Sequence, residues 1–168
     1  KNAMFGDQLP ETEAEIFAAL MGFWPSDEFA RLIGNTKADF RDVANQFKMP
    51  LDCAVKWAAI KYSDLFQMHY MKARWTKDSK APTIEDIYFP PGSSIRDKYH
   101  MAFDCPGTAA YKCLASKCDA ICDAKPSLQN DWSEEFFCRA FYEHQEHGLF
   151  RKADKIVVVS FPERFFDV

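Results

Sequence analysis

The segment DFRDVANQFKMPLDCAVKWAAIKY, residues 39–62, decides how the chain is expected to fold. Its apolar residues recur every three or four positions on either side of a turn at Lys48-Met49-Pro50, which is typical of two short amphipathic helices. The first face carries Phe40, Val43, Ala44 and Phe47, and the second carries Leu51, Ala54, Val55, Ala58 and Ala59. Two short helices joined by a tight turn predict a helix-turn-helix.

The side of the second helix opposite its apolar face offers candidate contact residues, which are Asp52, Lys56, Lys61 and Tyr62. In DNA-binding helix-turn-helix proteins the second helix lies in the major groove, with cations on nearby phosphates. The segment is therefore predicted to bind a protein partner or DNA. The alternative is a helical pair that only packs the core. On the binding interpretation, Lys56→Glu should weaken binding and leave the thermal midpoint nearly unchanged.

The chain also resembles the later part of ImmA/IrrE-type metallopeptidases over roughly residues 11–65. The resemblance rests on three stretches, Glu13 to Met21 (EAEIFAALM), Trp24-Pro25, and Asp42 to Val55. In that family a His-Glu-x-x-His helix supplies two zinc ligands and the general base. A later helix supplies the third ligand, and family members couple the peptidase to a helix-turn-helix-like region that regulates a transcriptional repressor.

The resemblance implies that Glu13 corresponds to the third zinc ligand. No His-Glu-x-x-His motif occurs in the sequence, so the chain as given is predicted to be a non-enzymatic regulatory or interaction protein. One alternative is a zinc metallopeptidase whose catalytic segment lies outside residues 1–168. As a structural residue, Glu13 would sit in the first turn of a helix, where the helix dipole favours a carboxylate.

Cysteine and histidine pairs suggest a second alternative, a structural metal-binding module. Cys118 and Cys122 are one turn apart on an expected helix, and His144 and His147 lie on another. If the two helices pair, four ligands suited to zinc converge. Otherwise the cysteines are free thiols that behave as small apolar residues.

After residue 62 the sequence predicts further helices and two strands, with a polar link at residues 76–82 and a turn or loop at 90–94. Helices are expected to continue from residue 63 to 75 and to form at 108–124 and 131–147, whereas strands are expected at 83–89 and 155–161. The predicted fold class is therefore mainly α (α+β). A helical bundle at residues 4–75 precedes an α+β accessory region of unknown role at 76–168, which ends in a buried strand.

Composition limits the classes of function. The hydrophobic content is 48%, which predicts a folded protein rather than a disordered one. The net charge of −4 gives no general attraction to nucleic acid, so DNA binding needs a local basic face. No stretch is long and apolar enough to cross a membrane, and a cytoplasmic location is expected.

Overall fold

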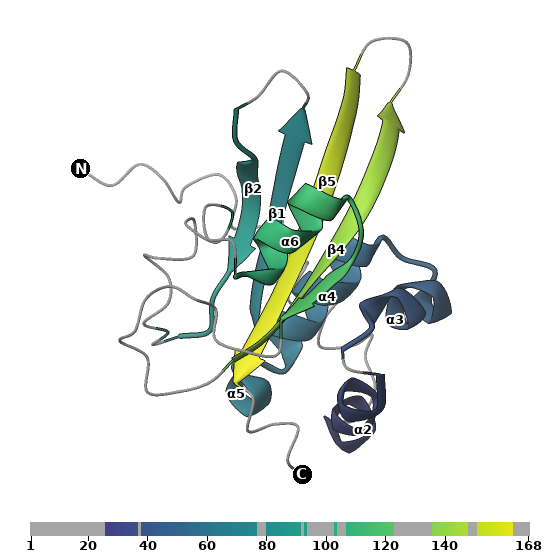
Figure 1. Ribbon diagram of the computed structural model, residues 1–168. Helices are drawn as coiled ribbons and strands as arrows, with labels where there is room; N and C mark the ends of the chain where they lie inside the picture. The colour runs from purple at the N-terminus through teal and green to yellow at the C-terminus, as the bar shows by residue number, and fades with distance from the viewer. Residues whose placement is uncertain are drawn as a thin grey trace, which may run out of the picture.

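A computed structural model describes residues 26–36, 38–76, 80–91, 93, 103, 107–122, 136–147 and 151–162. Within these residues four helices come first, and the elements that follow are mostly strands (Figure 1). The helices are α2 (Ser26–Thr36), α3 (Phe40–Phe47), α4 (Leu51–Lys61), α5 (Ser63–Phe66) and α6 (Ala109–Ser116). The strands are β1 (His69–Thr76), β2 (Thr83–Tyr88), β3 (Ala120–Cys122), β4 (Phe136–His147) and β5 (Arg151–Pro162).

The five strands form one antiparallel sheet in the order β2-β1-β5-β4-β3. Its central strand is β5, which pairs with β4 from Phe136↔Pro162 to His147↔Arg151. The expected strands at 83–89 and 155–161 are confirmed as β2 and part of β5. The predicted fold class, mainly α (α+β) with an N-terminal helical bundle, is wrong because this sheet organises the described chain into a mixed α/β fold.

Helices cover both faces of the sheet, as Figure 1 shows for α6 on one face and α3 and α4 on the other. Side chains alternate between the faces of a strand. On β5, Val157 and Val159 pack with α3 and α4, whereas Ile156 and Val158 pack with α6. The structure therefore has two hydrophobic cores separated by the sheet.

Three expected helices are partly or wholly wrong. Residues 63–75 give only the short α5 before β1 begins, residues 108–124 give α6 and then β3, and residues 136–147 form β4. Each of the strands β1, β4 and β5 carries buried apolar residues on both faces, because helices cover both faces of the sheet. Such a strand lacks the alternation of polar and apolar residues, so its pattern also fits a buried helix.

The helix pair at residues 39–62 is confirmed as α3 and α4. Asp39 caps α3, since its Oδ1 accepts a hydrogen bond from the Arg41 backbone N–H at 3.1 Å. Lys48 ends α3 in the left-handed conformation at φ 52°, and Pro50 precedes the first residue of α4. The tight turn thus follows from residues that are visible in the sequence.

Strand β1 lies at the end of the first predicted region, residues 4–75. It pairs with β2 and β5, which belong to the second predicted region, residues 76–168. The division into residues 4–75 and 76–168 stays a prediction. Across the described residues, no helix has the length and hydrophobicity to cross a membrane.

Candidate functional site: polar contacts between the helix pair and the sheet

Asp52, in the first turn of α4, points at the sheet rather than away from it. Its Oδ2 accepts from Lys72 Nζ on β1 at 3.3 Å, and its Oδ1 lies 3.5 Å from Lys155 Nζ on β5. Burial raises the pKa of Asp52, but the ammonium groups of Lys155 and Lys72 outweigh burial and hold the pKa below its ordinary value. The carboxylate is therefore charged and pairs α4 with two strands.

Lys155 extends this contact to the neighbouring strand. Its Nζ lies 2.7 Å from Glu143 Oε2 on β4. Burial lowers the pKa of Lys155, but the contact with Glu143 outweighs burial and raises the pKa above its ordinary value. Asp52, Lys72, Lys155 and Glu143 thus form a charged cluster of alternating sign between α4 and the centre of the sheet.

Lys56, one turn after Asp52, forms an ion pair with Asp86 on β2 at 3.0 Å, and its side chain is 19% exposed. The next two candidate residues lie at the other end of α4. Tyr62 is buried and stacks on Phe29 of α2 with ring centroids 4.1 Å apart. Lys61 is half-buried, with its Nζ 5.6 Å from the centre of the Tyr62 ring. The structure thus places all four predicted contact residues in contacts within the chain.

The Lys56–Asp86 pair changes the expected effect of Lys56→Glu on stability. The substitution places a second carboxylate beside Asp86, so we expect the free energy of unfolding to fall by about 1 kcal/mol and the thermal midpoint by about 2–4 °C. Thermal unfolding followed by circular dichroism measures this shift. Lys112→Glu is the control, because Lys112 is exposed on α6. Equal midpoints for the two variants would contradict the pairing.

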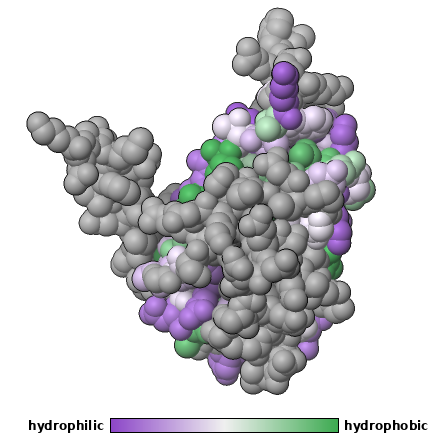
Figure 2. Space-filling view, turned by 60° about the vertical axis from the view of Figure 1, so that its left-hand side comes forward, coloured by the Kyte–Doolittle hydropathy of each residue, from purple (hydrophilic) through white to green (hydrophobic). Residues whose placement is uncertain are grey.

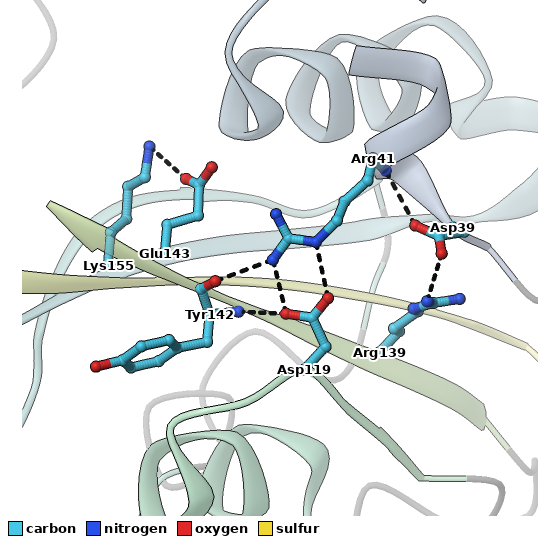
Figure 3. Close-up of polar contacts among 7 residues, drawn as sticks. All are labelled: Asp39, Arg41, Asp119, Arg139, Tyr142, Glu143 and Lys155. Atoms are coloured by element: carbon cyan, nitrogen blue, oxygen red, sulfur yellow. Dashed lines mark hydrogen bonds and ion pairs between the residues drawn. The ribbon is translucent and has the colours of Figure 1, made fainter. Parts of the chain in front are cut away.

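A second set of contacts fixes the start of α3 to β3 and β4 (Figure 3). The Arg41 guanidinium donates to both carboxylate oxygens of Asp119, at 2.8 and 2.7 Å, and to the Tyr142 carbonyl at 2.9 Å. Asp119 also accepts from the Tyr142 backbone N–H at 2.9 Å. Burial raises the pKa of Asp119, but the hydrogen bonds from Arg41 and Tyr142 outweigh burial and lower the pKa. Two-point binding of this kind fixes direction as well as distance.

Arg139, in the first half of β4, joins the same set of contacts. Its Nη2 donates to Asp39 Oδ2 at 2.8 Å, so the residue that caps α3 also binds the sheet. The guanidinium groups of Arg139 and Arg41 lie 5.1 and 5.7 Å from the centre of the Phe141 ring. Aromatic faces attract such cations. Helix α3 is therefore held by paired charges above an aromatic core residue.

We expect Arg41→Ala to lower the free energy of unfolding by about 1–2 kcal/mol. It removes three charge-assisted hydrogen bonds, and the partial exposure of Arg41 and Asp119 reduces the effect. Urea unfolding at neutral pH measures the loss. Arg31→Ala, on the exposed surface of α2, should change it by less than about 0.5 kcal/mol. A loss no larger than that of this control would show that the contact contributes nothing to stability.

The predicted metal ligands occupy positions different from those expected. Cys118 lies exposed between α6 and β3, Cys122 lies in β3, and His144 and His147 lie on β4, so neither residue pair lies on a helix. His144 Nδ1 lies 2.7 Å from Asp154 Oδ1 on β5. Within the described residues, no group of three or more His, Cys, Asp or Glu is placed to hold a metal ion.

Part of the metal prediction falls beyond the described structure. Glu13 and the side chains of Cys122 and His147 lie outside the described residues. The zinc site at Cys118, Cys122, His144 and His147 stays a prediction, without the helix pairing on which it was based.

Sequence reasoning did not select several residues of the polar contacts, among them Arg41, Lys72, Asp119, Arg139, Glu143 and Lys155. A signal was present in the sequence, because Lys72 and Arg139 lie within stretches that are rich in apolar residues, HYMKARW and FFCRAFY. A charge within a buried strand needs an opposite charge nearby. The partners lie far away in the sequence, so only the fold identifies them.

Comparison with known proteins shows similarity at the level of the fold. No family model matches the sequence, and no curated protein matches it. A solved structure of a Mycobacterium tuberculosis transcriptional regulator is similar, with a TM-score of 0.55 and 13% sequence identity over 82% of this chain. The match spans 40% of that regulator's length. The described chain is therefore similar in fold to part of that protein, and ImmA/IrrE membership stays a resemblance.

Proposed function

We propose that the chain is a non-enzymatic regulatory module that acts by binding a protein partner through residues 39–62, on the outer side of α3. The proposal rests on one observation, which is that charged residues of α4 form ion pairs with the sheet. Lys56 and Asp52, which a DNA-reading helix would present to the major groove, are paired with Asp86, Lys72 and Lys155 of the sheet. A helix with its cations engaged in this way is poorly suited to contact phosphates.

The outer side of α3 has the character of a protein-binding surface. Its exposed residues are Asp42, Asn45 and Gln46, and Asp27 and Glu28 are exposed on α2. Acidic residues repel DNA phosphates, whereas amides and carboxylates suit a polar protein contact. The fold similarity to part of a transcriptional regulator supports a regulatory role for such a contact.

Exposed hydrophobic side chains give no competing surface among the described residues. The large ones are Leu65, Ile87, Tyr111 and Ile121, and they belong to α5, β2, α6 and β3. On the face seen in Figure 2, the described hydrophobic residues show only as small areas. We therefore assign the contact to the polar surface of α3 rather than to an apolar area.

In-cell photo-cross-linking tests the proposal. A benzophenone amino acid replaces Gln46 on α3 in one variant and the exposed Lys112 on α6 in the control. We expect Gln46 to give a discrete product that protease removes and nuclease leaves intact, and Lys112 to give no such product. A nuclease-sensitive product would show DNA contact instead, and the same product from both positions would show that α3 has no special role.

Titration of duplex DNA of mixed sequence provides a separate test of the DNA interpretation. We expect no salt-dependent binding, and no difference between the native chain and Lys56→Met. Binding that weakens steeply with salt and again on loss of Lys56 would favour DNA as the partner.

A further inference from the structure

Two cysteines lie opposite each other on neighbouring strands. In the antiparallel pairing of β3 with β4, Cys122 is the direct partner of Cys138. Cα atoms of directly opposite residues are about 5.5 Å apart in a hydrogen-bonded pair and about 4.5 Å apart in a non-hydrogen-bonded pair. Disulfides are found at Cα separations of about 4.4–6.8 Å. Either kind of pair therefore brings the two backbones within the range of a disulfide.

The position of β3 in the sheet allows the two backbones to adjust. Strand β3 has three residues and lies at an edge of the sheet, where β4 is its only neighbour among the described strands. Edge strands with few hydrogen bonds open at low free-energy cost. Cys138 is 5% exposed and belongs to the core on the α6 face, so opening of β3 is the route by which a reagent reaches it.

We infer that Cys122 and Cys138 are a thiol modification site, and that they form a reversible intrachain disulfide on reaction with a low-molecular-weight disulfide. One cysteine thiolate attacks the reagent, forms a mixed disulfide and releases one reagent thiolate. The second cysteine thiolate then attacks the protein sulfur of the mixed disulfide and releases the second. The two cysteines lose two protons and two electrons, and the reagent is reduced to two thiols.

The other described thiols are placed less well for this reaction. Cys113 is buried on α6, and burial raises its pKa to about 12, so little of it is thiolate at neutral pH. Cys53 lies on α4, on the opposite side of the sheet from α6. Cys118 is exposed and reacts with reagents, but the strand pairing gives it no opposite cysteine.

The disulfide would act on the polar contacts of α3. Asp119, which binds Arg41, directly precedes β3 in the sequence. A covalent bond between β3 and β4 holds Asp119 beside Tyr142 and so favours the position of α3 seen in the structure. The inference goes beyond the proposed function and does not depend on a protein partner.

The test uses the whole chain, reduced first and then incubated with oxidised glutathione under native conditions. Peptide mapping without reductant should find one intrachain bond, between Cys122 and Cys138. The thermal midpoint of the oxidised chain should exceed that of the reduced chain by roughly 6–12 °C, which is the stabilisation expected when a disulfide closes the loop between Cys122 and Cys138. Dithiothreitol should reverse both changes.

Cysteine variants distinguish a bond between Cys122 and Cys138 from a disulfide that includes Cys118. Cys122→Ser and Cys138→Ala should each abolish the intrachain bond and the rise in midpoint, whereas Cys118→Ser should preserve both. Cys138→Ala removes a buried side chain and could unfold the chain. In that case Cys122→Ser decides the result. Finding no intrachain bond, or one that includes Cys118, would overturn the inference.

Discussion

Asp52→Ala is expected to lower the free energy of unfolding by about 2–4 kcal/mol at neutral pH. The Asp52 side chain is 14% exposed and lies between two ammonium groups, which belong to Lys72 and Lys155. Removing one partner of a largely buried ion pair leaves the other charge in a poorly solvated place. Lys155 keeps Glu143, which limits the loss. Urea unfolding measures the change, with the slope of the transition checked for constancy.

Asp42→Ala is the matched control for this substitution. Asp42 stands in the first turn of α3, as Asp52 does in the first turn of α4, so both carboxylates interact with a helix dipole. Asp42 is exposed, and its loss should cost less than about 1 kcal/mol. Similar losses for both variants would mean that the helix dipole, rather than the contact with the sheet, accounts for the effect.

Stability should fall by about 3 kcal/mol between pH 6.5 and pH 4 because of His69. Its side chain is buried in β1, where its Nε2 lies 2.7 Å from Ser93 Oγ. Burial lowers the pKa of His69 to about 4, from an ordinary value of 6.5. Above pH 6.5 the imidazole is neutral in both states. Between pH 6.5 and pH 4 only the unfolded chain binds the proton, so unfolding becomes easier as pH falls, and below pH 4 this loss is complete.

Comparison with His69→Gln isolates the contribution of this histidine. Urea unfolding at pH 7.5 and pH 4.5 should show a loss about 2–3 kcal/mol greater in the native chain than in the variant. Asp52 and Asp119 have lowered pKa values and titrate mainly below this range, so they contribute little to the difference. Parallel pH profiles for the two proteins would show that His69 is protonated equally easily in the folded and unfolded states.

Local sequence patterns predicted the helix pair because its signals are local. The apolar positions of α3 and α4 repeat within a few residues, and Lys48-Met49-Pro50 ends one helix and begins the next. Strand β4 was predicted as a helix because Phe137 and Phe141 face one core while Cys138 and Ala140 face the other. A strand buried on both faces carries no alternation that distinguishes it from a helix.

The same limit applies to the candidate site. The sequence places Asp52 and Lys56 on one polar side of α4, and that side is predicted to face a protein partner or DNA. It faces strands instead, because Lys72, Asp86 and Lys155 provide opposite charges there. A polar helix face is ambiguous until the residues opposite it are known.

A double-mutant cycle between Asp52 and Lys72 tests most directly whether charges hold the helix pair on the sheet. The free energy of unfolding is measured for the native chain, Asp52→Ala, Lys72→Met and the double variant. We predict a coupling energy of about 1–2 kcal/mol, because the two side chains bond directly at 3.3 Å. A coupling energy within error of zero would contradict the account, since the contact between Asp52 and Lys72 would then not help to hold α4 on the sheet.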